Sequence, residues 1–418
     1  MRKIIIVSIL ITGFYLVSSA QLSIEDCHEK ARENYPLIKK YGLIEQSKAY
    51  NLSNAEKGYL PQFQVNAKAT YQSDVTTLPI ALPGIDIPKL EKDQYQAVAE
   101  ANQVLWDGGI IRSQKKITEA GSDVEVKQLE VELYALDERV NRLFFGILLF
   151  DAQLEQNRIL QEELERNYRT IATYIENGIA NQADLDAVKV EQLNARQMRT
   201  QLQSTRTAYL NMLSIMIGTN LDENTTLLKP NETLPSMQIN RPELQLFDAQ
   251  NNLFDSQKDL IKSSYMPRLG LFVQGGIGRP ALNMLSNVFE PFYIGGIRMS
   301  WNFGSLYMQK NDLHKIEVNK HALNAQRETF LYNINLSLAR ENQDIKRLRD
   351  LMKYDDEIIS LRENIRESAE AKVANGTLTV TELMREISQE DLARQTKAAH
   401  EIDLLIAIYN LKNTVNDP

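Results

Sequence analysis

The residues best suited to chemistry in this chain are four histidines, one cysteine and many carboxylates, and none of them forms a catalytic motif. His314 and His321 are seven residues apart on a predicted helix, which is not the i, i+4 spacing of a zinc-binding helix. The glycine-rich segment 275–278 precedes no helix of the kind that binds phosphate. Cys27 lacks the surroundings of a nucleophile and fits an amphipathic helix better. We therefore predict no enzyme activity, no cofactor and no metal site.

The start of the chain indicates export from the cytosol. Arg2 and Lys3 precede an apolar stretch from Ile4 to Val17, and Ser18-Ser19-Ala20 resembles a cleavage site, so residues 1–20 are predicted to be a signal peptide. The next apolar run, Leu143–Phe150, is far shorter than the roughly 20 residues of a spanning helix. An exported chain of this kind is either soluble or a β-barrel. The net charge of −8 argues against nucleic acid as a partner.

The chain contains an internal tandem repeat, because four short signatures recur in the same order. They are Asn34-Tyr35-Pro36 with Asn240-Arg241-Pro242, Tyr59-Leu60-Pro61 with Tyr265-Met266-Pro267, Leu105-Trp106-Asp107 with Ser300-Trp301-Asn302, and Asn177-Gly178 with Asn375-Gly376. The order predicts a first repeat over 21–218, a connection over 219–239 and a second repeat over 240–418.

Each repeat is predicted to contain two β-strands, at about 62–72 and 94–106 and at about 268–278 and 292–302. In 62–72 the odd positions are apolar and the even positions polar, the pattern of a membrane strand with one lipid-facing side. The alternative is a soluble β-hairpin with one polar face exposed to solvent. Four strands cannot close a barrel and open edges are not tolerated in lipid, so several chains would have to share one barrel. Trp106 and Trp301 lie at the ends of predicted strands, so we expect them in the aromatic belt that contacts lipid headgroups.

Long helices are predicted at about 108–176 and 306–374, each free of proline and followed by a return helix at about 182–217 and 379–413. Apolar residues in the first long helix are spaced by three and four, as in a coiled coil. They are Leu129, Leu133, Leu136, Val140, Leu143 and Ile147. In the first return helix the corresponding row is Leu185, Val188, Ala195, Leu202, Tyr209 and Met212.

Taken together, the tandem repeat, the Asn-x-Pro and Tyr-x-Pro signatures and the Asn-Gly turns resemble the TolC family of outer-membrane efflux proteins. The resemblance implies a mainly α fold with a β-barrel portion. In it, a homotrimer would form a twelve-stranded barrel in the outer membrane of a Gram-negative bacterium, continued by an α-helical coiled-coil barrel in the periplasm. The partners it implies are outer-membrane lipid, a periplasmic adaptor (membrane-fusion) protein and an inner-membrane pump or ABC transporter.

The resemblance also suggests site residues at the two Asn-Gly turns. The residues expected at the periplasmic tip, in contact with the adaptor, are Asn177, Gly178, Ile179, Ala180, Asn375, Gly376, Thr377 and Leu378. Asp184, Glu382 and Arg385 are expected at the tunnel entrance. For Glu382 the alternative is a solvated carboxylate that stabilises a helix N-terminus. The Tyr and Arg of the family's latch are Val373 and Leu378 here, so its gating mechanism does not carry over.

The function expected on these grounds is a passive exit duct of a tripartite efflux or type I secretion system. The sequence does not discriminate between these two systems. A periplasmic coiled-coil scaffold without a barrel is the alternative, and the alternating strands argue against it.

Overall fold

The computed structural model describes residues 21–77 and 90–417, which divide into two compact units. The first unit comprises the segment up to Ile38, Glu132–Arg241 and the segment from Asn333, and the second comprises Lys39–Val131 and Pro242–Tyr332. Each unit therefore takes residues from both predicted repeats, because the long helices α3 (Ile110–Glu176) and α6 (Leu306–Ala374) contribute to both. The expected signal peptide, residues 1–20, lies outside the described residues.

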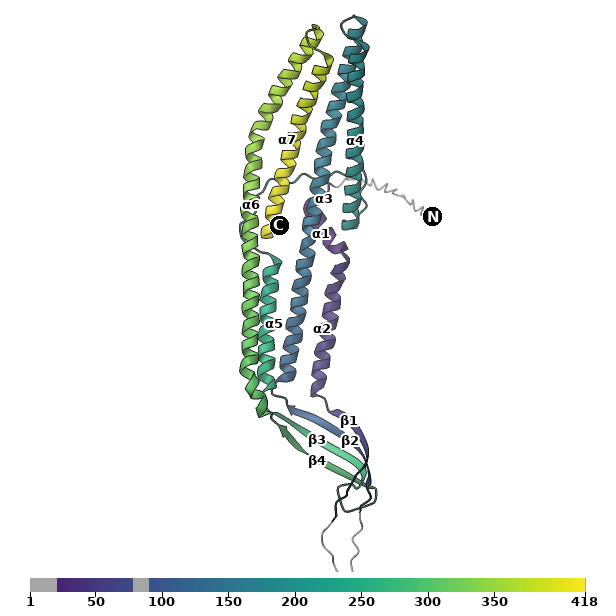
Figure 1. The fold of residues 1–418 in the computed structure, drawn as a ribbon, viewed down its shortest axis with the longest axis vertical. Helices are drawn as coiled ribbons and strands as arrows, with labels where there is room; N and C mark the ends of the chain where they lie inside the picture. Colours follow the sequence, from purple (N-terminus) through teal and green to yellow (C-terminus); the bar gives the residue numbers. More distant parts are fainter. Residues whose placement is uncertain (1–20, 78–89, 418) are drawn as a thin grey trace, which may run out of the picture. The chain divides into compact units, whose positions relative to one another are not determined.

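The first unit is mainly helical and contains two helical hairpins, with one isolated parallel bridge between Leu22 and Leu227 (Figure 1). The final part of α3 pairs with α4 (Gln182–Ile217), and the final part of α6 pairs with α7 (Val380–Val415). Near the turns, residues of all four helices share one core, which includes Ile171, Val188, Val373 and Ile387. The two hairpins therefore pack against each other close to their turns.

A short N-terminal helix, α1 (Ile24–Asn34), completes the first unit. Ser23 and Asp26 form a capping box at its start, so the first free N–H groups of the helix have acceptors. The helix ends at Tyr35, whose extended backbone is what a following proline favours, and a short 3-10 turn (Pro36–Lys39) follows.

The core of the first unit is densest where α3 meets α7. Leu133, Leu136, Val140, Leu143 and Ile147 are all buried, as the sequence spacing predicts. Phe144 and Phe145 are also buried, and the Phe145 ring lies 5.0 Å from the ring of Tyr409 on α7. The predicted apolar run at Leu143–Phe150 is thus part of a packed core.

The second unit combines helices with a sheet (Figure 1). Its helices are α2 (Lys40–Glu56), α5 (Pro242–Ser264), the first parts of α3 and α6, and two 3-10 turns, Lys57–Tyr59 and Phe303–Ser305. Polar contacts tie the helices together, among them Lys116 of α3 with Asp259 of α5 at 2.9 Å and Tyr265 with Asp312 of α6 at 2.6 Å.

The sheet has four antiparallel strands in sequence order, so the prediction of a mainly α fold with four strands is confirmed. They are β1 (Gln62–Tyr71), β2 (Asp93–Trp106), β3 (Arg268–Arg279) and β4 (Glu290–Ser300). Within the described residues, the outer edges of β1 and β4 pair with no other strand. One face exposes large apolar side chains, with Phe63, Val65 and Tyr293 exposed by 81%, 77% and 84%.

The other face of the sheet is polar, and side chains from neighbouring strands form hydrogen bonds with one another on it. Glu100 of β2 is almost buried there, and its carboxylate accepts hydrogen bonds from Gln64 of β1 at 3.2 Å and Gln274 of β3 at 2.9 Å. Arg298 of β4 adds an ion pair to Glu100 at 3.4 Å. Over the described part of the chain, no helix has an apolar stretch long enough to cross a bilayer.

Candidate functional site

The turn between α3 and α4 is a Schellman motif built on a left-handed glycine. Gly178 has φ +75°. Its N–H donates to the carbonyl of Ile175 at 3.1 Å, and the N–H of Ile179 donates to the carbonyl of Tyr174 at 2.8 Å. The free carbonyls at the end of α3 are satisfied in this way. Asn177, Ile179 and Ala180 complete the turn, and Ile179 is half exposed.

The turn between α6 and α7 has the same geometry. Gly376 has φ +66°, its N–H donates to the carbonyl of Val373 at 2.9 Å, and the N–H of Thr377 donates to the carbonyl of Lys372 at 2.9 Å. Asn375 precedes the glycine, as in the first turn. The two turns therefore present equivalent backbones at the ends of the two hairpins.

Replacing Gly376 with alanine is expected to destabilise the second hairpin. An added Cβ meets no atom within 4 Å, so the cost comes from the left-handed backbone alone, about 1–2 kcal/mol. Gly42 is the matched control, because it also has open space but lies inside α2 with no positive φ. Gly42→Ala is expected to stabilise its helix by about 1 kcal/mol. Changes of opposite sign in the free energy of unfolding, measured by chemical denaturation, would support this explanation. Equal changes in the two variants would contradict it.

Both return helices begin with a capping box whose acidic residue is one of the predicted entrance residues. Asn181 accepts from the N–H of Asp184 at 3.2 Å, and the Asp184 carboxylate accepts from the N–H of Asn181 at 3.0 Å. Thr379 and Glu382 exchange the same pair of bonds, each at 3.2 Å. These bonds fix the direction of both carboxylates at the start of α4 and α7.

Glu382 therefore caps the start of α7, as the alternative considered in the sequence describes, and its place at the tunnel entrance stays a prediction. Its bonds with the backbone and side chain of Thr379 lower the pKa of Glu382, so it carries a negative charge at neutral pH. Arg385 pairs with Glu386 at 2.9 Å. Leu378, Glu382 and Arg385 nevertheless line one groove of about 530 Å³ between α6 and α7, so the structure brings these three predicted residues together.

The two positions of the family's polar latch are apolar and used for packing. Val373 is 4% exposed and belongs to the core shared by the hairpins, and Leu378 packs against that core. Neither side chain can donate a hydrogen bond. Polar contacts between the hairpins at this level must therefore come from other residues.

A charged network that the sequence did not reveal lies close to the turns. The guanidinium of Arg366 on α6 lies 2.7 Å from Glu390 of α7 and 2.7 Å from Glu370 of its own helix. Its Nε also lies 3.3 Å from Oε1 of Glu163 on α3, without the geometry of a hydrogen bond. Arg366 thus connects the first hairpin to the second.

The same network continues along α7 and contains more acids than bases. Glu390 is 4% exposed and bridges Arg366 and Arg394, and Arg394 also pairs with Glu363. Asp391 accepts from Gln395 at 2.6 Å, but burial, together with the charges of Glu163 and Glu390, raises its pKa to about 6. Burial also raises the pKa of Glu163.

The stability of the first unit is expected to fall between about pH 4 and pH 6 through Asp391. In the unfolded chain this carboxyl ionises near its ordinary pKa of 3.8, whereas in the folded unit it stays protonated up to about pH 6. Ionisation therefore favours the unfolded state as the pH rises through this window. Asp391→Asn should flatten this part of the pH profile of unfolding. An unchanged profile in the variant would show that other groups cause the loss.

The predicted interface aromatics lie at one end of the sheet in the second unit. Trp106 is the last residue of β2 and Trp301 follows β4, and they are exposed by 47% and 44%. The indole N–H of Trp301 donates to the carbonyl of Tyr265 at 3.1 Å, and its ring lies 4.4 Å from that of Phe303. Contact with lipid headgroups stays a prediction.

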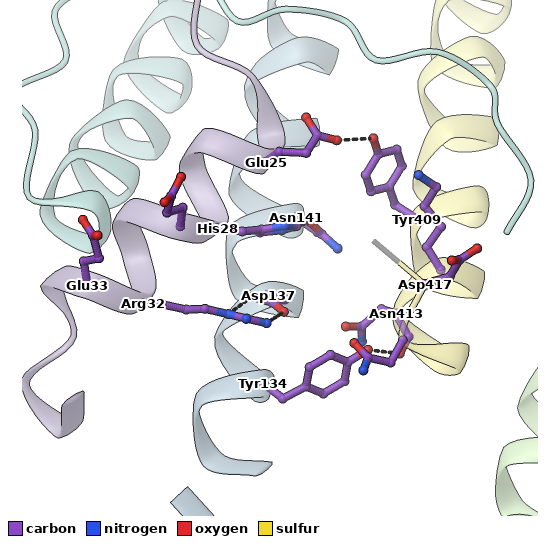
Figure 2. A pocket seen from close by; sticks show the side chains of 13 residues that line it. Glu25, His28, Arg32, Glu33, Tyr134, Asp137, Asn141, Tyr409, Asn413 and Asp417 are labelled. Carbon is purple, nitrogen blue, oxygen red and sulfur yellow. Dashed lines mark hydrogen bonds and ion pairs between the residues drawn. The ribbon is translucent and has the colours of Figure 1, made fainter. Parts of the chain in front are cut away.

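A cavity of about 560 Å³ lies among α1, α3 and α7 in the first unit (Figure 2). Its polar side chains are paired with each other. His28 lies 2.7 Å from Asn141, Arg32 lies 2.5 Å from Asp137, and the Tyr409 hydroxyl donates to Glu25 at 3.1 Å. These bonds join α1 to α3 and α7, and the predicted site residues lie elsewhere.

Residues 28–219, close to the first predicted repeat, match the family model described as outer membrane efflux protein. The match covers somewhat less than half of the chain. The family resemblance predicted from the sequence is thus confirmed. No curated protein matches the chain in sequence.

Solved structures described as membrane channels or outer membrane proteins share the fold over most of the chain. CusC, described in terms of transmembrane channel formation, has 13% identity and a TM-score of 0.69, over 94% of this chain and 91% of CusC. VceC, an outer membrane protein of Vibrio cholerae, has 11% identity and a TM-score of 0.67, over 94% and 96%. CmeC, an outer membrane channel of Campylobacter jejuni, has 12% identity and a TM-score of 0.63, over 94% and 85%.

The family description agrees with two further predictions. It refers to the outer membrane, which is the predicted location. It also describes an efflux protein, which is consistent with the prediction that the chain is not an enzyme.

Proposed function

We propose that this chain is a subunit of an outer-membrane exit duct, in which three copies close one barrel of twelve strands. The observation that carries the proposal is the sheet, with one exposed apolar face and two unpaired edges. In water such a face is unfavourable, whereas in lipid it is solvated by the acyl chains. The edge groups of β1 and β4 need partners in lipid, and neighbouring copies can supply them.

The helical hairpins would extend this duct into the periplasm. We propose that the equivalent turns at Gly178 and Gly376 form the tip that meets a periplasmic adaptor and, through it, an inner-membrane pump or ABC transporter. Asp184 and Glu382, one at the start of each return helix, would place acidic groups at the tunnel entrance. The equivalent turns and capping boxes support two repeats, 21–218 and 240–418, joined by 219–239.

The duct is proposed to be passive, with energy supplied by the inner-membrane partner. Both multidrug efflux and type I secretion fit this role. Export assays with deletion of one candidate partner at a time would separate them, because each system depends on a different class of transporter.

The assembly can be tested by extracting the protein from outer membranes in mild detergent and measuring its mass by light scattering. Three chains in one particle, with channels of stable conductance in planar bilayers, are the expected result. A monomer that leaves the membrane without detergent would overturn the proposal and favour the periplasmic scaffold.

The face of the sheet that meets lipid can be tested with neighbouring residues of β1. Val65→Arg places a charge on the exposed apolar face and is expected to cost about 2–4 kcal/mol near the bilayer centre. Gln64→Arg is the matched control, because Gln64 lies on the polar face beside Glu100. Loss of outer-membrane assembly only in Val65→Arg is expected, and equal loss in both variants would contradict the assignment of faces.

A further inference from the structure

Two arginine side chains lie next to each other on the polar face of the sheet, at the end where the strands join the helices. Arg268 begins β3 opposite Ser300 of β4, and Arg298 lies two residues before Ser300 on the same face. Side chains in this diagonal position on neighbouring strands are within reach of each other. Both arginines line one cleft of about 330 Å³. Two positive charges held this close repel each other, and an anion bound between them would remove the repulsion.

Most N–H donors of these two side chains are not used by the protein itself. Arg268 is exposed, and it has no hydrogen bond or ion pair within the described part of the chain. Arg298 has an ion pair with Glu100 at 3.4 Å, and its side chain is 55% exposed. The Arg298 guanidinium lies 4.4 Å from the ring centre of Phe272, which belongs to the polar face. Because a guanidinium has five N–H groups, most of them remain available to a ligand in the cleft.

The acidic side chains near the cleft already have partners. Asp107 lines the cleft, but its two oxygens accept from the N–H groups of Gly109 at 2.8 Å and Ile111 at 2.6 Å. Glu100 is 8% exposed, and its carboxylate accepts from two glutamines in addition to its ion pair with Arg298. Both acids are thus withdrawn from the surface, so the charge that the cleft presents to a ligand is positive.

The remaining polar groups of the cleft suit an oxyanion. Asn102 and Ser300 also line the cleft, and their amide and hydroxyl groups can donate hydrogen bonds to oxygen. Arginine binds carboxylate and phosphate oxygens through two parallel hydrogen bonds. The ligand that fits the cleft is therefore a phosphate, sulfate or carboxylate group.

We propose that this arginine cleft, formed by Arg268, Arg298, Asn102 and Ser300, binds the anionic group of molecules that pass through the duct. The inference rests on the proposed function, in which the polar face of the sheet lines the interior of the barrel, and it adds the substrate class, organic anions. Three copies would place three such clefts around the interior at one level. Weak binding there would concentrate anionic cargo in the barrel and still let it leave.

Calorimetric titration of the detergent-extracted full chain with inorganic pyrophosphate tests the cleft directly. The wild type is expected to bind, and Arg268→Gln to weaken binding by about tenfold, the effect of losing one charge-assisted hydrogen bond. Arg298→Lys should also weaken binding, because it keeps the charge beside Glu100 but loses the fork of donors. A wild type that does not bind, or equal affinity in the wild type and both variants, overturns the inference.

Lys68 provides the matched control on the same face of the sheet. It is exposed on β1 opposite Gln96, and Gln96 comes six residues before Asn102 on β2, about 20 Å away at 3.4 Å per residue. Lys68→Gln removes the same charge, but at this distance salt screens its effect on the cleft. The affinity for pyrophosphate should change by less than about twofold. A loss as large as that in Arg268→Gln would show a diffuse positive field and overturn a defined cleft.

The phosphate of a lipid headgroup has the same chemistry as a dissolved anion, and channel recordings in planar bilayers distinguish the two. Pyrophosphate should reduce the current through wild-type channels at a concentration about tenfold lower than through Arg268→Gln channels. If this difference persists when anionic lipid is added to a neutral bilayer, the cleft takes dissolved anions. If it disappears, a lipid headgroup occupies the cleft, and the binding of cargo is overturned.

The two measurements also separate this inference from the function on which it rests. A wild type that forms no channels overturns the duct and, with it, the passage of anionic cargo, whether or not pyrophosphate binds in detergent. Channels that pyrophosphate blocks equally in the wild type and in Arg268→Gln overturn the cleft and leave the duct intact.

Discussion

Replacing Arg366 with methionine is expected to destabilise the joint between the two hairpins by about 3–5 kcal/mol. The change keeps much of the aliphatic volume but removes the guanidinium beside Glu163 and one of the two guanidinium groups beside Glu390, which keeps only Arg394. Both carboxylates are largely buried, so water cannot replace the guanidinium. Hydrogen exchange of amides in α6 and α7 is a suitable measurement, because both tryptophans lie in the other unit and do not report on this joint.

Arg347 provides the control for this substitution. It also pairs with an acid on α6, Asp344 at 3.3 Å, but its side chain is 55% exposed. Arg347→Met should therefore change stability by only about 0–1 kcal/mol. Adding Glu390→Gln to Arg366→Met should recover part of the loss, because it lowers the excess of buried negative charge that remains when only Arg394 pairs with Glu390. If Arg366→Met behaves like Arg347→Met, the network does not hold the hairpins together.

Truncation of Phe145 to alanine is expected to cost about 3–5 kcal/mol, through lost burial and the cavity that remains. The ring is 1% exposed and contacts the rings of Phe144 and Tyr409, at centroid distances of 5.7 and 5.0 Å. Because Tyr409 belongs to α7, the change loosens the packing of α7 on α3. Thermal unfolding followed by the helical circular dichroism signal measures the loss.

An exposed aromatic residue of α6 controls for the general effect of removing a ring. Tyr332 is 64% exposed, and Tyr332→Ala should stay within about 0.5 kcal/mol of the wild type. Phe145→Leu, which retains most of the apolar volume, should fall between the two. A Phe145→Ala variant as stable as Tyr332→Ala would show that this core can collapse around the missing ring.

Much of the fold follows from patterns that are local in the sequence. The apolar row from Leu133 to Ile147 is buried because its spacing matches one side of a helix, and the alternation in β1 defines two faces of a sheet. The turns at Gly178 and Gly376 follow from glycine at a left-handed position. Such features depend on residues a few positions apart, which one sequence displays directly.

One predicted contact row is wrong at its end. Met212 was expected on the buried side of α4 but is 52% exposed, and Leu213 is fully buried in its place. From the buried Val188, twenty-five residues make almost seven turns at about 3.6 residues per turn, which brings Leu213 back to the same side. Leu213 also comes four heptads after Leu185, so the coiled-coil repeat itself leads to Leu213, and the row was ended one residue too early on Met212.

The charged network around Arg366 could not be predicted from the sequence, for a different reason. Glu163 and Arg366 come from opposite halves of the chain. Many other acidic and basic residues occur in helices with similar neighbours, so nothing in the sequence marks these two as a pair. Only the packing of the hairpins selects which of them meet and which are buried. Glu382 shows the opposite case, since its capping box with Thr379 is readable from a four-residue motif.

The open edges of the sheet have a consequence for how the protein reaches its membrane. A lone copy would present the unpaired backbone groups of β1 and β4 to lipid, at several kcal/mol for each group. In the proposed trimer, three copies must therefore insert together, and the yield of inserted protein should rise steeply with the concentration of unassembled copies. A copy with one blocked edge would also prevent two normal copies from closing the barrel. Mutations that block an edge are therefore expected to be genetically dominant.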